Sequence, residues 1–95
     1  MAQQREIKKV LCVCKGNSDR SPVMAKVLWM YLETRFPDVN IESAGILEVA
    51  AAGGPCSPHA TFAAGRIGLD LVNHRRRWIN NLDLTDFDLF VVVDE

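Results

Sequence analysis

The chain has 95 residues, 48% of them hydrophobic and 24% charged, with a formal net charge of −1. This length supports a single domain with a modest core, and the near-neutral charge excludes a general attraction to nucleic acid or anionic membranes. The first residues, MAQQREIKK, are polar and no apolar run is long enough to span a membrane, so we expect a cytoplasmic protein. The three cysteines fit reduced thiols rather than a disulfide framework.

The first half of the chain predicts two strands and a helix. An apolar run at residues 10–13 predicts a strand buried on both faces, followed by a polar loop. A helix is predicted over 22–36, with Ser21 as its N-cap and Pro22 at its first position. Its expected apolar face includes Leu28, Leu32, Phe36, Met24, Val27 and Tyr31. Residues 39–45 predict a second strand.

The second half predicts a loop, a helix, a connector and a strand. Small residues fill the loop at 46–57, and a helix is predicted over 58–68 with Gly68 as its C-terminal stop. Residues 74–88 form a connector with one helical turn. The apolar run from residue 89 predicts a third strand, again buried on both faces.

The alternation of strands and helices predicts an α/β fold with a parallel sheet and right-handed crossovers. A core strand of such a sheet is normally followed by a covering helix and another strand, whereas this sequence stops at Glu95. Either three strands and two helices suffice, or a C-terminal part is missing. We expect residues 1–95 to form a single domain.

The loop after the first strand has the features of an anion-binding site. Cys14 lies at the carboxyl end of that strand, where ligands of open α/β sheets bind, and the loop runs into a helix N-terminus. Gly16 permits a tight turn, and Asn17 tolerates a left-handed backbone better than other non-glycine residues. Arg20 can hold a phosphate with two hydrogen bonds. The loop therefore predicts a phosphate site.

The same surroundings favour a reactive thiol. Thiols that face a helix N-terminus and an arginine have pKa values of roughly 3.5–7.5. We therefore expect Cys14 to be a thiolate that attacks the phosphorus of a bound phosphate. Cys12 is interpreted as a small buried apolar side chain. A Walker-type nucleotide loop is excluded because its motif does not occur.

A structural zinc site is a weaker alternative. Cys12, Cys14, Cys56 and His59 provide C-x-C and C-x-x-H spacings that zinc can use. However, Cys12 lies within a buried strand, which makes its joint use with a loop cysteine awkward. We expect no metal and no cofactor.

The stretch VCKGNSDRSP at residues 13–22 resembles the signature of the low-molecular-weight protein tyrosine phosphatases, V-C-x-G-N-x-C-R-S-P. The resemblance continues through ESAG, GGPCSPHA, GLDLVNHRRRWI and FDLFVVVDE, in that order. It implies the family's phosphotyrosine phosphatase I-like fold, a doubly wound, three-layer α/β fold with an open parallel sheet. It also implies that the last strand and helix of the family fold are missing, so that the single domain is C-terminally incomplete.

The resemblance implies a phosphocysteine mechanism. By matched position, Cys14 is the nucleophile, Arg20 binds two phosphate oxygens and stabilises the transition state, and Ser21 hydrogen-bonds the thiolate and favours its departure. The remaining residues of the phosphate-binding loop are Lys15, Gly16, Asn17, Ser18 and Asp19.

A supporting network is implied behind the loop. Asn17, Ser43 and His74 match family residues that hold the loop in shape, although His74 without the resemblance could equally be a solvated loop residue. The arginines at 75–77 are interpreted as a solvated face rather than a nucleic-acid patch, because no second basic run accompanies them.

Two departures from the family pattern stand out. Asp19 occupies the place of a second loop cysteine; its carboxylate beside Arg20 could oppose phosphate binding, and a protective disulfide between loop cysteines is unavailable. The family's general acid belongs to an Asp-Pro pair near the C-terminus, and no such pair occurs here. We therefore expect a weak phosphatase. Asp19 as a replacement acid is disfavoured because Arg20 should keep it ionised.

Two classes of function remain open. The first is an enzyme that hydrolyses a phosphorylated protein or a small phosphomonoester, with phosphotyrosine as the family-typical substrate, phosphoarginine as an alternative, and arsenate reduction disfavoured by the missing redox cysteines. The second is a module that binds phosphate or a phosphoprotein without efficient turnover. In both, phosphate or sulfate occupies the loop, and an uncovered edge of the last strand favours a homodimer.

Overall fold

The computed structural model describes residues 7–17 and 20–92. Its strands are β1 (Lys9–Cys14), β2 (Asn40–Gly45) and β3 (Leu89–Val92). Its α-helices are α1 (Arg20–Leu32) and α2 (Pro58–Arg66). Three short 3₁₀ helices complete the secondary structure: η1 (Glu48–Ala52), η2 (Ile79–Asn81) and η3 (Leu84–Asp86).

The three strands form one parallel sheet in the order β2-β1-β3. The central strand β1 is buried from Val10 to Cys14, as its unbroken apolar run predicts. Its last residue, Cys14, is paired with Gly45 at the end of β2, so both strands deliver their carboxyl ends to the same edge of the sheet. The α/β class and the parallel sheet are thereby confirmed.

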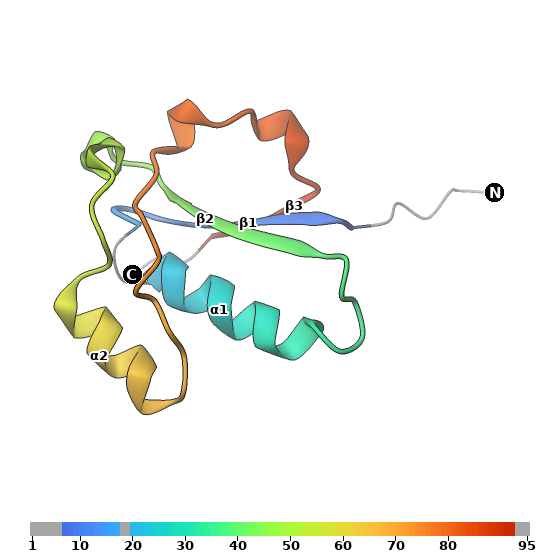
Figure 1. Cartoon of the computed structure of the whole chain (residues 1–95). Helices are drawn as coiled ribbons and strands as arrows, with labels where there is room; N and C mark the ends of the chain where they lie inside the picture. The colour runs from blue at the N-terminus through green and yellow to red at the C-terminus, as the bar shows by residue number, and fades with distance from the viewer. Residues whose placement is uncertain (1–6, 18–19, 93–95) are drawn as a thin grey trace.

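The two faces of the sheet are covered differently. Figure 1 shows α1 and α2 on one side and the segment that carries η2 and η3 on the other. On the helical side, α2 and the residues after it pack against Val23 and Val27 of α1. On the opposite side, Leu11 and Val13 of β1 pack with Phe87. The alternation of side chains along β1 thus divides the core into two clusters.

Helix α1 differs from its predicted form at both ends. It begins at Arg20 rather than at Pro22, so Ser21 lies inside the helix and the expected N-cap is wrong. The helix also ends at Leu32, which leaves Phe36 outside it and 55% exposed, and Tyr31 is 74% exposed. The apolar face is therefore narrower than expected, because α1 is covered mainly by the sheet and α2.

Helix α2 begins and ends on local signals. Ser57 is its N-cap: its side chain accepts a hydrogen bond from the Ala60 amide, and Pro58 follows in the first turn. Gly68 has φ +82°, the left-handed conformation expected of a stop residue. The connector between α2 and β3 contains two 3₁₀ helices where one helical turn was expected, and η1 lies within the predicted loop.

Strand β3 is an edge strand of the described sheet. It pairs with β1 alone in that part of the chain, and Leu89, Phe90 and Val92 are exposed, Val92 by 71%. The expected burial on both faces is therefore wrong within the described residues, while the expected open edge is present. Among the described helices, none combines the length and apolar character needed to cross a membrane.

Candidate active site

The predicted phosphate-binding loop lies at the carboxyl edge of the sheet, between β1 and α1. Its described residues are 14–17 and 20–21; Ser18 and Asp19 lie outside the described residues, so the effect of Asp19 stays a prediction. The loop is tied to the sequence after β2, because the Ile46 amide donates to the Cys14 carbonyl over 2.9 Å and the Leu47 amide donates to the Lys15 carbonyl over 3.0 Å.

The thiol of Cys14 is held between the loop and the helix. Its Sγ lies 3.0 Å from the Ser21 hydroxyl and accepts a hydrogen bond from the Asn17 amide over 3.3 Å. The residue is only 4% exposed, so its thiol is largely shielded from solvent. When the sulfur is a thiolate, both neighbours can donate to it, which stabilises its negative charge.

Asn17 is the centre of a buried polar network. Its backbone adopts φ +56°, the left-handed conformation that asparagine tolerates, and this turns its side chain toward the protein interior. The side-chain Nδ2 donates to the hydroxyls of Ser21 (2.8 Å) and Ser43 (2.9 Å). The side-chain Oδ1 accepts from the Arg77 amide over 2.9 Å. One side chain thus connects the loop, α1, β2 and the connector.

His74 contacts the same residue from behind the loop. Its Nε2 lies 2.9 Å from the Asn17 carbonyl oxygen, which can only accept, so Nε2 carries the proton. Burial lowers the pKa of His74 below its ordinary value, and the positive charges of Arg77, Arg75 and Lys26 lower it further, against the hydrogen bond to Asn17. The structure thus brings Asn17, Ser43 and His74 together.

Two arginines near the loop were not anticipated. Arg76 Nε donates to the Gly16 carbonyl over 3.1 Å, and the Arg77 guanidinium donates to the Ser43 carbonyl and to Glu42 Oε1, the latter over 2.8 Å. The interpretation of residues 75–77 as a solvated face is therefore wrong for these two. Their position directly after His74, which the resemblance placed beside the loop, was the available signal.

Glu42 anchors this arginine from β2. Burial alone would raise the pKa of Glu42, but its hydrogen bond and ion pair with Arg77, together with Lys9 at 3.4 Å, hold that pKa below its ordinary value. The carboxylate is therefore charged at neutral pH, and it fixes the guanidinium against the strand that also carries Ser43.

Gly45 allows the loop to approach β2 closely. A Cβ at this position would lie 2.6 Å from the Lys15 carbonyl oxygen and 3.0 Å from the Asn17 amide nitrogen, which is closer than atoms can pack. The absence of a side chain is therefore required where the end of the second strand passes under the loop.

The other predicted site residues occupy distinct positions. Arg20 begins α1 with its Nη1 atom buried, at the end of the helix where anions are stabilised. Cys12 is completely buried, and burial raises its pKa to about 11, so it is an inert thiol beside the site. In the described part of the chain, no three His, Cys, Asp or Glu side chains form a group that could hold a metal ion.

Comparison with known proteins assigns the chain to a family. Residues 9–95 match the family model of the low molecular weight phosphotyrosine protein phosphatases. The chain belongs to this family. A curated relative, the probable low molecular weight protein-tyrosine-phosphatase EpsP of Ralstonia nicotianae, is 38% identical over 88 residues, which cover 93% of this chain and 57% of EpsP.

Solved structures of this phosphatase family share the fold. Wzb of Vibrio vulnificus, in complex with benzylphosphonate, is 29% identical with a TM-score of 0.79 over 92% of this chain and 58% of its own. Wzb of Escherichia coli K30, in complex with sulphate, is 27% identical with a TM-score of 0.76 over 92% of this chain and 57% of its own. The chain thus spans a little over half the length of these family members.

Proposed function

We propose that the chain hydrolyses phosphomonoesters through a phosphocysteine intermediate on Cys14. The observation that carries this proposal is the placement of the Cys14 sulfur, 3.0 Å from the Ser21 hydroxyl and 3.3 Å from the Asn17 amide, at the start of α1. Family membership supports it, because relatives carry the name of protein tyrosine phosphatases.

In the first step, the Cys14 thiolate attacks the phosphorus of the bound ester. A sulfur–phosphorus bond forms, and the bond from phosphorus to the ester oxygen breaks. That oxygen leaves with the electron pair and takes up a proton from water. Arg20 holds two of the three phosphoryl oxygens, and amide groups of the loop donate to the phosphoryl oxygens as well, so that donors meet the developing negative charge.

In the second step, water attacks the phosphocysteine. A new phosphorus–oxygen bond forms, the sulfur–phosphorus bond breaks, and inorganic phosphate leaves. The Ser21 hydroxyl then donates to the departing thiolate. Asn17 Nδ2 donates to the same hydroxyl oxygen over 2.8 Å, so the hydroxyl hydrogen can go to the sulfur at 3.0 Å or to the more distant Ala44 carbonyl at 3.5 Å.

The rate of the first step depends on the leaving group. No Asp-Pro pair occurs in the sequence to supply the family's general acid, and such groups contribute about 10²–10⁴-fold to the rate. A phenol with a pKa near 10 needs the proton more than an activated phenol does. We therefore infer weak turnover of phosphotyrosine and faster turnover of activated aryl phosphates.

The test is hydrolysis of 4-nitrophenyl phosphate and of phosphotyrosine by the full chain at about pH 5 to 8. We expect turnover of the activated ester, a lower rate with phosphotyrosine, and loss of both in Cys14→Ser. Cys12→Ala, which removes the neighbouring thiol, should keep the activity. A folded wild-type chain without turnover of either ester would contradict the proposal.

A phosphate-binding module without efficient turnover is the second candidate, since these 95 residues contain no Asp-Pro pair that could protonate a leaving group. Binding of phosphate by a folded but inactive chain would identify this function. For either function we propose a phosphorylated protein or a small phosphomonoester as partner, self-association through β3, and a cytoplasmic location, in keeping with three free cysteine thiols.

A further inference from the structure

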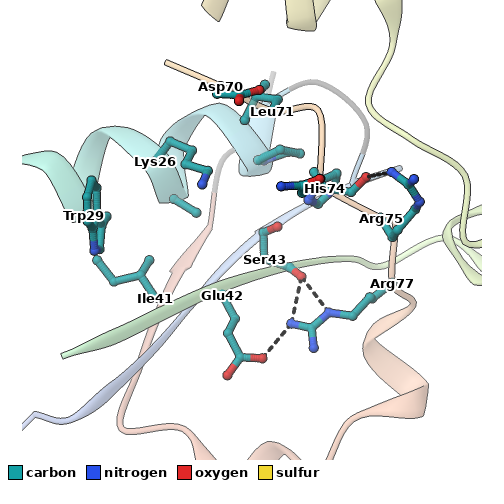
Figure 2. Close-up of a pocket in the computed structure, with 13 residues that line it drawn as sticks. Lys26, Trp29, Ile41, Glu42, Ser43, Asp70, Leu71, His74, Arg75 and Arg77 are labelled. Carbon is teal, nitrogen blue, oxygen red and sulfur yellow. Dashed lines mark hydrogen bonds and ion pairs between the residues drawn. The ribbon is translucent and has the colours of Figure 1, made fainter. Parts of the chain in front are cut away.

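A cavity lies behind the phosphate-binding loop. Its volume is about 520 Å³, and it is bounded by α1, by residues 41–43 of β2 and by the segment 70–77 (Figure 2). This volume is in the range of small-molecule sites. Cys14 does not line it, whereas Ser43 and His74 do, so the cavity adjoins the polar network around Asn17 but not the thiol.

The charged side chains around this cavity differ in their partners, and only Arg77 and Glu42 form an ion pair among those described. Arg77 is bound to Glu42, Arg75 donates to the carbonyl oxygens of Val72 and His74, and Asp70 accepts from the Val72 amide. Within the described residues, Lys26 makes no hydrogen bond or ion pair. Figure 2 shows its side chain pointing into the space between Trp29 and His74. Lys26 is exposed, so the cavity presents an ammonium that an anion can reach without breaking another interaction.

The cavity also has apolar walls. Trp29 is 51% exposed although it lines the cavity, and Ile41 of β2 lies beside it in Figure 2. Leu71 and Pro22, both buried, supply apolar surface deeper in the cavity. A large exposed indole beside an aliphatic side chain offers a flat ring a stacking surface.

We propose that this cavity binds a small aromatic carboxylate, with its carboxylate on the Lys26 ammonium and its ring between Trp29 and Ile41. An aromatic ring with one carboxylate matches both halves of the cavity, whereas a bare inorganic anion would leave the indole exposed and a neutral ring would leave the ammonium without a partner. Burial is the main cause of the lowered pKa of His74, and the positive charges of Arg77, Arg75 and Lys26 lower it further.

An occupant of this cavity touches the residues that hold Asn17. Ser43 and His74 each make a hydrogen bond to Asn17, from its side chain and to its carbonyl oxygen respectively. A ligand here should therefore be sensed at Asn17, while the phosphate-binding loop can be occupied at the same time.

The test is a nuclear magnetic resonance titration of the ¹⁵N-labelled full chain with 2-naphthoate in saturating inorganic phosphate, which keeps the loop occupied. We expect saturable shifts of the Trp29 indole signal, of the amides at 73–77 and of the Asn17 amide. Lys26→Gln should weaken binding about five- to tenfold, since it removes a charge-assisted hydrogen bond. Lys26→Arg should restore most of the affinity.

Two controls isolate the charge. Arg35→Gln removes a cation outside this cavity and should leave the affinity unchanged, and the neutral naphthalen-2-ylmethanol should bind more weakly than 2-naphthoate. The proposal is overturned if the Trp29 indole shows no saturable shift, if Lys26→Gln binds as tightly as the wild type, or if phosphate displaces the naphthoate. The spectrum of each variant shows directly whether it is folded.

Discussion

His74 couples the fold to pH because its imidazole is held neutral. Its Nε2–H donates to the Asn17 carbonyl, and burial lowers its pKa below the ordinary value of 6.5. The unfolded chain therefore takes up the proton first as the pH falls. The contribution of the neutral His74 imidazole to the free energy of unfolding is constant above pH 6.5. It declines as the pH falls from 6.5 to the lowered pKa of His74.

We expect the free energy of unfolding, from urea titrations at successive pH values, to decrease below pH 6.5. In His74→Gln, whose side-chain amide can still donate to the Asn17 carbonyl, this part of the decrease should disappear. His59→Gln, on the exposed side of α2, should retain it. An identical pH profile for His74→Gln and the wild type would contradict the neutral-imidazole assignment.

Gly45 provides a second prediction at the scale of one residue. A methyl group there would collide with the Lys15 carbonyl at 2.6 Å, so Gly45→Ala must displace the loop. Overpacking of this kind costs about 1–3 kcal/mol of unfolding free energy. Gly65→Ala is the matched control, since nothing lies within 4 Å of its new methyl group and alanine favours a helix by about 0.5–1 kcal/mol.

Urea unfolding of the two glycine variants measures this difference. Gly45→Ala should be less stable than the wild type and should bind inorganic phosphate more weakly, whereas Gly65→Ala should be at least as stable. Equal stability and equal phosphate affinity in Gly45→Ala would show that the loop does not depend on this close approach.

The residue types alone predict only the local part of the site, and the distant residues Ser43 and His74 were predicted from the resemblance. Cys14, Asn17 and Ser21 lie within one loop and the first turn of a helix, where glycine, asparagine and a following helix already imply an anion site. The roles of Arg76 and Arg77 could not be read in this way, because their partners Gly16 and Ser43 are 60 and 34 positions away. Only the folded crossover brings these groups together.

At the scale of elements, strands were predicted better than helix ends. The apolar runs of β1 and β3 leave little choice of structure, whereas the start of α1 was misplaced because Ser21 fits an N-cap by residue type. Its hydroxyl instead contacts the Cys14 sulfur and accepts from Asn17. This contact with the sulfur thus outweighs a local capping preference, and it was implied by the resemblance to the family signature rather than by the type of residue at the helix start.

Helix α2 has an N-cap residue, Ser57, whose side chain makes the capping hydrogen bond. The Ser57 hydroxyl accepts from the Ala60 amide over 3.1 Å, and only Ala60 and Ala64 of this nine-residue helix are buried. We expect Ser57→Ala to lower the free energy of unfolding by about 1 kcal/mol, measured by urea denaturation. Ser57→Asn, which keeps an acceptor at the cap, should stay within a few tenths of the wild type. Equal losses in both variants would contradict the capping role.

At the scale of the whole molecule, the two edges of the described sheet differ in how far other segments pair with them. At the last residue of β2, the Gly45 amide donates to the Arg77 carbonyl over 2.8 Å, so the connector pairs with the end of this edge. Strand β3 has no such cover within the described residues and exposes Leu89, Phe90 and Val92. An exposed apolar edge of this kind is a template for pairing with another chain.

We therefore expect the chain to self-associate through β3 as its concentration rises, seen as an increasing weight-average sedimentation coefficient. Val92→Lys places a charge on a side chain that is 71% exposed, so it should leave the fold intact and shift association to higher concentration. Val72→Lys adds the same charge at a 61% exposed valine away from the edge and should associate like the wild type. A chain that remains monomeric at every concentration, or equal association of the two lysine variants, would contradict pairing through this strand.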